Sequence, residues 1–175
     1  MRLRQSESVM RIALSPELQR LKITNPLHWI ATGFGSGLSP VAPGTAGSLA
    51  AIPFYLGFQH LSEAGYVLTI VFSFFLGVWA TQNATDAIGV DDHGALVWDE
   101  FVGMWITLFV APPGWLWIVL GFILFRIFDI IKPWPIRPID RRLHGGWGIM
   151  LDDVLAGIFA WLSLQLLYTL LQQFG

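Results

Sequence analysis

The sequence predicts an all-α, polytopic membrane protein, and its composition is the first reason. The 175-residue chain is 54% hydrophobic and only 13% charged, which is far more apolar than an ordinary soluble domain. Several apolar runs approach the roughly 20 residues that a helix needs to cross a bilayer. The chain has no cysteine, which excludes disulfides and thiolate chemistry. We expect a basic, amphipathic cytoplasmic arm at residues 1–28 and one membrane-embedded domain at residues 29–175.

The basic residues give the expected orientation. All ten lie in two clusters, and nothing between residues 23 and 125 is basic. Under the positive-inside rule both clusters face the cytoplasm, so an even number of crossings separates them. The clusters are Arg2, Arg4, Arg11, Arg20 and Lys22, and then Arg126, Lys132, Arg137, Arg141 and Arg142.

Five apolar runs account for the expected helices in order. The first, residues 46–61, holds Pro53 and is expected to be a kinked or partly re-entrant helix. Residues 65–84 form an ordinary span, and residues 101–111 and 115–131 are separated by a Pro-Pro-Gly reversal. The last run covers residues 149–171. Because the third run is only 11 residues long, we expect four to five transmembrane or re-entrant helices, with five crossings as the leading count.

This topology places the polar segments on one side of the membrane. Residues 33–48, 85–100 and 126–146 all fall on the expected cytoplasmic side. Asp152 and Asp153 are expected there too, in the first turn of the last helix. Within the segment 126–146, Pro133, Pro135 and Pro138 predict an extended, stiff stretch of chain.

Two adjacent pairs of carboxylates, Asp99-Glu100 and Asp152-Asp153, are the candidate metal ligands. Each pair continues along its helix into small residues, which are typical of helix–helix contacts in membranes. Like charges gathered at low dielectric repel, and Mg²⁺ with its preference for oxygen ligands relieves that repulsion. The alternative is that each pair only complements a helix dipole. The small residues are Gly103 and Thr107 after the first pair, and Ala156, Gly157, Ala160 and Ser163 after the second.

The second basic cluster supplies candidate phosphate-binding residues. Arg126, Asp129 and Lys132 follow i, i+3, i+6 spacing, which indicates either a structural ladder of ion pairs or contacts with an anionic head group. Arg141 and its neighbour Arg142 are placed to attract lipid phosphate. The Gly-rich segment 33–48, with the hydroxyls of residues such as Ser39 and Thr45, is either a phosphate cradle or a plain entry loop.

Long motifs over residues 25–165 resemble the phosphatidylglycerophosphatase A family of bacterial inner-membrane lipid phosphatases. They are GSGLSPVAPGTAGSLAAIP, VWDEFVGMW, RIFDIIKPWPI, DRR and HGGWGIMLDDVLAG. The resemblance implies removal of the terminal phosphate from phosphatidylglycerophosphate to give phosphatidylglycerol, with Mg²⁺, in a multi-pass protein whose active site faces the cytoplasm. The family's motif positions fall here on Asp99, Glu100, Arg126, Asp129, Lys132, Asp140, Asp152 and Asp153.

Motifs of other phosphatases are absent from the sequence, which favours metal-assisted hydrolysis. The chain has no cysteine nucleophile, no DxDx(T/V) motif and no PSGH or SRx₅Hx₃D block. We expect Asp99, Glu100, Asp152 and Asp153 to hold Mg²⁺, which activates a water; a transient aspartyl-phosphate is the alternative. Catalysis is assigned to Asp129, Lys132 and Asp140, and substrate binding to Arg126, Lys132, Arg141, Ser39 and Thr45.

Two other functions remain open at this stage. The same charges suit a phosphatase of another lipid phosphate, or a protein that binds or transports such a lipid without cleaving it. No internal repeat of the kind found in transporters supports the second possibility. In every case the partner is a membrane lipid, and we expect no nucleic-acid partner.

Overall fold

The computed structural model describes residues 15–22, 24–140 and 142–174, apart from the side chains of Asp140 and Phe174. These residues contain seven α-helices, two 3-10 helices and no strand, so the all-α prediction is confirmed. In chain order the elements are η1 (Leu18–Arg20), α2 (Pro26–Ala31), η2 (Ser36–Leu38), α3 (Pro43–Phe58), α4 (Glu63–Ile88), α5 (Trp98–Thr107), α6 (Trp115–Ile131), α7 (Ile136–Asp140) and α8 (Gly145–Phe174).

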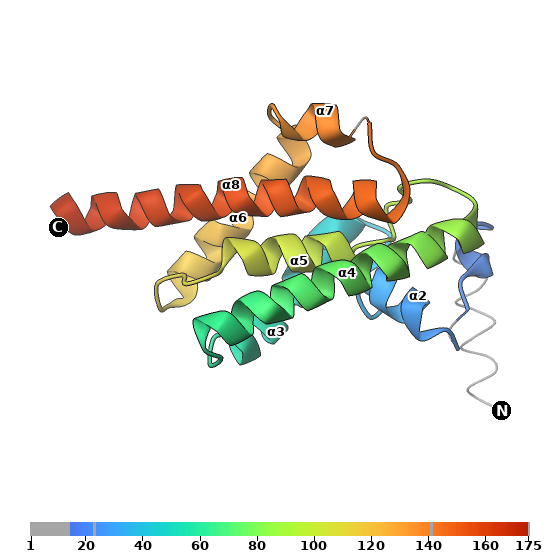
Figure 1. The fold of residues 1–175 in the computed structure, drawn as a ribbon, viewed down its shortest axis with the longest axis horizontal. Coiled ribbons are helices and arrows are strands. Elements are labelled where there is room, and N and C mark those ends of the chain that lie inside the picture. The colour runs from blue at the N-terminus through green and yellow to red at the C-terminus, as the bar shows by residue number, and fades with distance from the viewer. Residues whose placement is uncertain (1–14, 23, 141, 175) are drawn as a thin grey trace.

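The two longest helices, α4 and α8, run in opposite directions, and the short helix α5 lies between them (Figure 1). The α3–α4 turn, the α5–α6 turn and the C-terminus lie at one end of the bundle. The α4–α5 connection and the start of α8 lie at the other end (Figure 1). Helix α5 packs against α3, α4, α6 and α8, and nine of its ten residues are buried. The segment that the sequence marks as too short to span is therefore the enclosed core of the bundle.

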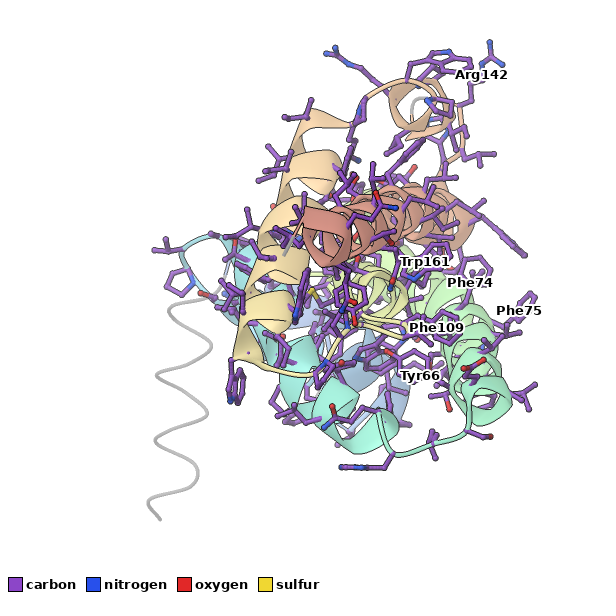
Figure 2. All side chains as sticks on the ribbon, turned by 90° about the vertical axis from the view of Figure 1, so that its left-hand side faces the viewer. Tyr66, Phe74, Phe75, Phe109, Arg142 and Trp161 are labelled. Atoms are coloured by element: carbon purple, nitrogen blue, oxygen red, sulfur yellow. The ribbon has the colours of Figure 1, made fainter. Side chains whose placement is uncertain are left out.

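Large apolar side chains cover the outside of the bundle. Figure 2 shows Phe75 pointing outward from α4, whereas Tyr66, Phe109 and Trp161 lie among the helices. Outward residues recur every three or four positions on each of three helices, which gives each one a continuous apolar face. Of the described helices, α4 and α8 are long and apolar enough to cross a membrane. The outward residues are Leu68, Phe72, Phe75 and Trp79 on α4, Leu116, Val119, Ile123, Ile127 and Ile130 on α6, and Leu162, Leu166 and Leu170 on α8.

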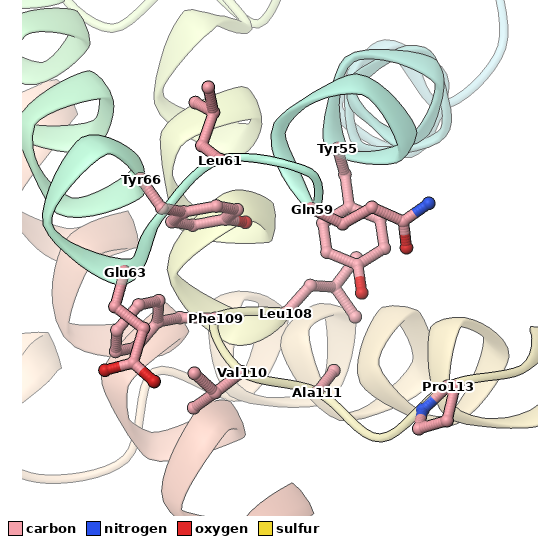
Figure 3. Close-up of a pocket in the computed structure, with 10 residues that line it drawn as sticks. All are labelled: Tyr55, Gln59, Leu61, Glu63, Tyr66, Leu108, Phe109, Val110, Ala111 and Pro113. Atoms are coloured by element: carbon pink, nitrogen blue, oxygen red, sulfur yellow. The ribbon is translucent and has the colours of Figure 1, made fainter.

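A small cavity of about 220 Å³ lies at the end that holds the α3–α4 and α5–α6 turns (Figure 3). Glu63 is the single charged residue among those that line it, and none of them is basic. The cavity reaches Leu108, just beyond the end of α5, whereas Asp99 lies at the start of that helix. Ten helical residues span about 15 Å, so this cavity is remote from the acidic pairs. Its lining residues are Tyr55, Gln59, Leu61, Glu63, Tyr66, Leu108, Phe109, Val110, Ala111 and Pro113.

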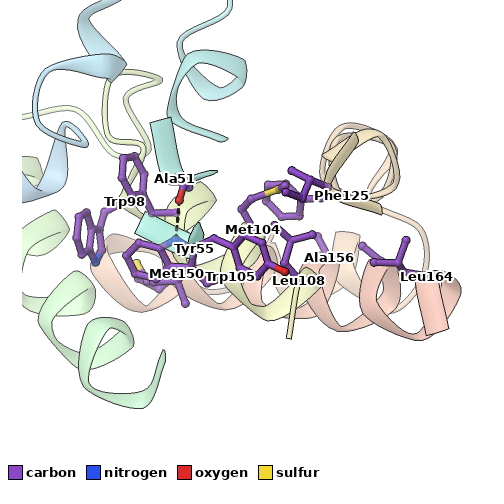
Figure 4. Packing of buried hydrophobic residues seen from close by; sticks show 14 of the residues in the cluster. Ala51, Tyr55, Trp98, Met104, Trp105, Leu108, Phe125, Met150, Ala156 and Leu164 are labelled. Carbon is purple, nitrogen blue, oxygen red and sulfur yellow. Dashed lines mark hydrogen bonds between the residues drawn. The ribbon is translucent and has the colours of Figure 1, made fainter. Parts of the chain in front are cut away.

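Trp105 holds three helices together in the core. Its indole Nε1 donates a hydrogen bond of 2.9 Å to the carbonyl oxygen of Ala51 in α3 (Figure 4). Its own carbonyl oxygen accepts a bond of 2.8 Å from the hydroxyl of Tyr66 in α4. Buried polar groups need such partners, because a buried donor or acceptor without one costs roughly 1–3 kcal/mol. These bonds fix the position of α5 relative to α3 and α4.

Glycines bring α5 and α8 into direct contact. A Cβ atom on Gly157 would lie 2.6 Å from the carbonyl oxygen of Gly103, and one on Gly103 would lie 2.9 Å from the carbonyl oxygen of Asp153. The hydroxyl of Thr107 donates to the carbonyl oxygens of both glycines, at 2.9 and 3.4 Å. The predicted stripes of small residues are thus confirmed as a helix–helix contact. That contact places Asp153 against α5.

The described part of the N-terminal arm packs on the bundle. Leu18, Leu21 and Leu27 contact a buried cluster that includes Ala84 and Ile88 of α4. The guanidinium of Arg20 donates a 2.8 Å hydrogen bond to the carbonyl oxygen of Ile88, and Asn25 bonds to Asn83 of α4. Helix α2 runs across the expected boundary at residues 28 and 29. Arg2, Arg4 and Arg11 lie outside the described residues.

The predicted start of the last helix was wrong. Helix α8 begins at Gly145, so Asp152 and Asp153 are its eighth and ninth residues and lie in its third turn rather than its first. Gly146 and Gly148 lie inside the helix and do not end it. Because they have no side chain, neighbouring backbone can approach them closely. A Cβ on Gly146 would lie 2.2 Å from the carbonyl oxygen of Val78. The N–H of Gly146 also donates to the side-chain oxygen of Gln82, at 2.9 Å.

The predicted extended segment at the proline cluster was also wrong. Residues 133–135 form a turn, and α7 follows directly at Ile136. Pro138 is the third residue of α7, where an amide hydrogen has no helical partner, so a proline there removes no bond. Ile136 is fully buried, which holds α7 against the bundle.

Gly157→Ala is expected to destabilise the protein by about 1–3 kcal/mol, because the added methyl group overlaps backbone of α5 that cannot move freely. The measurement is thermal melting of the detergent-solubilised protein. Gly57→Ala in α3 is the matched control, since a Cβ there meets nothing within 4 Å and alanine favours helix. Equal melting temperatures for the two variants would show that the α5–α8 contact has room to spare.

Candidate active site

Three carboxylates from two helices converge at the α5–α8 contact. Asp99 comes from the first turn of α5, and Asp152 and Asp153 come from the third turn of α8. One oxygen atom from each lies within 4.8 Å of the others. Their exposed fractions are 8%, 6% and 2%, so all three are buried. This arrangement brings together three of the four predicted metal ligands.

A helix dipole does not account for Asp152 and Asp153. The favourable effect of a helix N-terminus on a carboxylate fades within the first turn. Both residues lie beyond it, in the third turn of α8. Another interaction must compensate for burying two adjacent carboxylates at these positions.

Several oxygen atoms of this group are left without a hydrogen bond. Asp99 Oδ1, Glu100 Oε2 and Asp153 Oδ2 are buried and have no hydrogen-bond partner among the residues that the structure describes. Native proteins leave very few buried polar atoms in this state, and each calls for an explanation. The acceptors here are all carboxylate oxygens, which suit a hard cation.

Glu100, the fourth predicted ligand, is placed differently. Its side chain is buried beside Asp99, but it is not one of the three convergent carboxylates. Glu100 Oε1 lies 4.0 Å from the guanidinium Nη1 of Arg126. Glu100 thus lies next to Arg126 of α6 and apart from the three convergent carboxylates.

Arg126 connects three elements of the site. Its Nη1 lies 2.6 Å from Asp129 Oδ2, one helical turn later in α6, and donates a longer bond of 3.3 Å to the hydroxyl of Ser48 in α3. Of the two alternatives for this spacing, the ion pair of a ladder is present between Arg126 and Asp129.

Lys132 does not continue that ladder along α6. It is the C-cap of the helix, with a left-handed backbone (φ 45°), and its N–H donates to the carbonyl oxygen of Phe128. Its ammonium group forms an ion pair with Asp152 Oδ2 in α8. The chain thus turns at Lys132 in a way that directs a cation to the carboxylate group.

The N-terminus of α3 lies in the segment 33–48 that was predicted as either a phosphate cradle or an entry loop. The sequence prediction missed that a helix begins there, at Pro43. A Cβ on Gly44 would lie 2.3 Å from Glu100 Oε1 and 3.2 Å from the guanidinium of Arg126. The first helical bond of α3 runs from the N–H of Ala46 to the carbonyl oxygen of Ala42, so the amides of Gly44 and Thr45 precede it. The proline before Gly44 was the available signal, because proline favours the first position of a helix.

Comparison with known proteins agrees with these observations. Residues 29–168 match the family described as Phosphatidylglycerophosphatase A. The chain belongs to the phosphatidylglycerophosphatase A family. It is 52% identical over 142 residues to Phosphatidylglycerophosphatase A of Escherichia coli (strain K12), covering 81% of this chain and 83% of that protein. It is 50% identical over 147 residues to the protein of the same name from Haemophilus influenzae, covering 82% and 89%.

A third relative has a different name, which is also that of a lipid phosphatase. The chain is 44% identical over 142 residues to a Bacteroides thetaiotaomicron protein provisionally named a phosphatidylinositol-3-phosphatase, covering 76% of this chain and 87% of that protein. No solved structure matches the chain. The family resemblance expected from the motifs is therefore confirmed.

The remaining predicted residues of this family member are Ser39, Thr45, Asp140 and Arg141. The hydroxyl of Ser39 donates to the carbonyl oxygen of Val41, within its own loop. Thr45 lies in the first turn of α3, beside Gly44. Asp140 ends α7, but its side chain lies outside the described part of the structure, as does the whole of Arg141.

Asp153→Asn is expected to raise the melting temperature of the metal-free protein. The substitution removes one of several like charges that repel each other at low dielectric, and asparagine has nearly the same shape. The measurement is thermal melting in detergent with a chelator present. Asp91→Asn, at an exposed position, is the control and should leave the melting temperature unchanged. A lower melting temperature for Asp153→Asn would mean that its charge is already balanced by the cations nearby.

Proposed function

We propose that the protein removes the terminal phosphate of phosphatidylglycerophosphate to give phosphatidylglycerol, assisted by Mg²⁺. The observation that carries the proposal is the convergence of three buried carboxylates beside two cations, Arg126 and Lys132. Asp99 and Asp153 each hold an oxygen atom with no hydrogen-bond partner among the described residues. The names of the relatives identify the lipid. A phosphomonoester is a dianion near neutral pH, so it needs both cations and donors to enter a group of carboxylates.

The donor set fits Mg²⁺. Asp99, Asp152 and Asp153 offer only oxygen atoms, and the chain has no cysteine to favour a softer metal. These three residues would hold the ion. When bound, Mg²⁺ supplies charge neutralisation of the phosphate and activation of a water at neutral pH.

The chain's own residues then position the phosphate. Arg126 presents two guanidinium nitrogens toward the start of α3, where the amides of Gly44 and Thr45 precede the first helical bond. Guanidinium groups and helix N-termini both bind phosphate oxygens. Asp129 Oδ2 at 2.6 Å and Glu100 Oε1 at 4.0 Å both lie next to Nη1 of the guanidinium, which keeps Arg126 oriented. The phosphate is thus placed between α3, α6 and the carboxylates.

Hydrolysis requires one bond to form and one to break. A water oxygen attacks phosphorus, the bond from phosphorus to the glycerol oxygen breaks, and the proton of the water must reach a base. We assign the base to Asp129, because it pairs with Arg126 and so lies next to the group that binds the phosphate. Lys132 stabilises the charge that develops on the leaving glycerol oxygen until that oxygen takes up a proton from water, and its ion pair with Asp152 holds it in place.

The experiment is phosphate release from defined lipid phosphates by the purified protein, with and without Mg²⁺. Asp99→Asn, Asp152→Asn and Asp153→Asn are each expected to lower turnover of phosphatidylglycerophosphate by at least about a hundredfold, since loss of a metal ligand costs several kcal/mol. Asp91→Asn should turn over at the rate of the natural protein. Mg²⁺ should raise the melting temperature of the natural protein and not of the three variants.

The same experiment separates the alternatives. Near-normal rates in all three variants would show that the carboxylates are structural. Release from phosphatidylinositol 3-phosphate in preference to phosphatidylglycerophosphate would favour the substrate named for the Bacteroides relative. Binding of the lipid without release of phosphate would indicate a lipid-binding protein.

The orientation in the membrane is also part of the proposal. We place the carboxylate site on the cytoplasmic side of a bacterial inner membrane, with α3, α4, α5, α6 and α8 providing five crossings. The arrangement of chain ends supports it, because the turns expected outside and the C-terminus share one end of the bundle (Figure 1). The outward apolar face of α6 supports its contact with lipid. Helix α5 is enclosed by the other helices, so its proposed crossing lies in the interior of the bundle.

A reporter fused to the C-terminus is expected to read periplasmic, and one inserted after Asp91 cytoplasmic. The reason is that both basic clusters then face the cytoplasm, as the positive-inside rule requires. Paired reporters that are active only on opposite sides of the membrane make the measurement. A cytoplasmic C-terminus would instead indicate an even number of crossings, such as four with the first segment re-entrant.

A further inference from the structure

A second cavity opens beside the active site, at the junction of α6 and α7. Its volume is about 640 Å³, within the range of sites that bind small molecules and head groups. Among the lining residues that the structure describes, three are basic and none is acidic. The lining residues are Ile131, Lys132, Pro133, Trp134, Arg137, Pro138 and Arg142.

Lys132 belongs to both the cavity and the active site. It lines the cavity, and its ammonium group forms an ion pair with Asp152 among the convergent carboxylates. The side chain of Lys132 therefore lies between a molecule bound in the cavity and the carboxylates of the active site. Arg137 and Arg142 line the cavity from the α7 side, and Figure 2 shows Arg142 at the outer edge of the molecule.

The outer face of α6 gives an apolar route to this cavity. Ile127 and Ile130 are exposed on successive turns, and Ile131 and Trp134 are 65% and 82% exposed at the cavity itself. Tryptophan favours the level of the lipid head groups. A lipid whose acyl chains lie along α6 would thus present its head group to the basic cavity.

We infer that this cavity binds the internal phosphodiester of the lipid substrate and so determines specificity for a head group that carries two phosphates. The inference rests on the proposed function. The substrate has a phosphodiester next to its acyl chains and, across a glycerol unit, the phosphomonoester that is hydrolysed. Arg137 and Arg142 bind the diester, and the monoester passes Lys132 to reach Arg126 and the carboxylates. Arginine suits this task because its planar group binds phosphate through two parallel hydrogen bonds.

The chemistry of the substrate distinguishes this role from general attraction to anionic lipid. Phosphatidate has the same acyl chains and a phosphomonoester, but it has no internal phosphodiester. The cavity should therefore favour phosphatidylglycerophosphate over phosphatidate, and this preference should depend on Arg137 and Arg142.

The test compares kcat/KM for phosphatidylglycerophosphate and phosphatidate in neutral detergent micelles with Mg²⁺. Arg137→Gln and Arg142→Gln are each expected to lower the ratio of the two values about tenfold or more, as for loss of a hydrogen bond to a charged group. Arg137→Lys keeps the charge without the two parallel bonds and should give an intermediate ratio. Lys22→Gln removes an exposed charge on the other basic cluster and should leave the ratio unchanged. An unchanged ratio in both arginine variants would overturn the inference while leaving the proposed function intact.

A binding measurement keeps the test valid if the proposed function fails. Should the natural protein release no phosphate from phosphatidylglycerophosphate, the proposed function is wrong, and binding of short-chain phosphatidylglycerol decides on the cavity. This probe carries the diester and no monoester. At least about tenfold weaker binding by Arg137→Gln and Arg142→Gln than by Lys22→Gln supports the diester site; equal binding by all three excludes it. Thermal melting shows whether each variant is folded. If Arg137→Gln does not fold, the comparison of Arg142→Gln with Lys22→Gln decides the test.

Discussion

The structure depends on holding several carboxylates together inside an apolar bundle. Asp99 and Asp153 face each other across the contact between α5 and α8, where glycines bring the two backbones together. Removing a carboxylate from water and placing it near another is unfavourable, so the contact must be stabilised elsewhere. The buried core around Trp105 does this by fixing α5 through hydrogen bonds to α3 and α4. The enclosed position of the short helix is thus a structural requirement of the acidic site.

Cations complete the balance of charge, and each comes from α6. Arg126 lies within reach of Glu100 and Asp129, and Lys132 pairs with Asp152 at the point where α6 ends. The left-handed backbone at Lys132 ends the helix and turns the chain toward α7. If α6 continued as a straight helix beyond Lys132, the following residues would extend along its axis instead of turning into α7. The end of α6 therefore serves the active site and also opens the cavity that α7 lines.

Local sequence patterns predicted the parts of the fold that depend on local spacing. The small residues after each acidic pair predicted that the two helices meet, because a stripe at three- and four-residue spacing always shares one helix face. The pairing of Arg126 with Asp129 was predictable for the same reason. Lys132 differs, because its partner is 20 residues away in another helix. The end of α6 at Ile131 was predicted, and Pro133 disfavours helix at the residue before it. Nothing in the spacing indicates that Lys132 then reaches a carboxylate of α8.

Glycine and proline caused both errors in the predicted elements. Gly146 and Gly148 were interpreted as a loop, yet they lie in α8, where their missing side chains allow contact with Val78 and Leu143. The meaning of a glycine depends on what approaches it, and for Gly146 that neighbour, Val78, is distant in the sequence. Similarly, Pro138 ends a helix in most sequence contexts but is tolerated in the first turn of α7. Gly44 was part of the predicted segment 33–48, but its closeness to Glu100 and Arg126 was not predicted, because these two residues come from two other helices.

The two ends of the bundle differ in a way that constrains how a lipid can be used. The cavity near Glu63 has one acidic residue and no cation among its lining residues, so it offers nothing to bind a phosphate. The cavity beside α7 is basic, lies next to an apolar face of α6, and shares Lys132 with the carboxylates. A lipid phosphate cannot cross the apolar core without losing its hydration, which is costly for a dianion. Because the cations and the convergent carboxylates lie together at one end, the phosphate can react at head-group level while the acyl chains remain in the membrane.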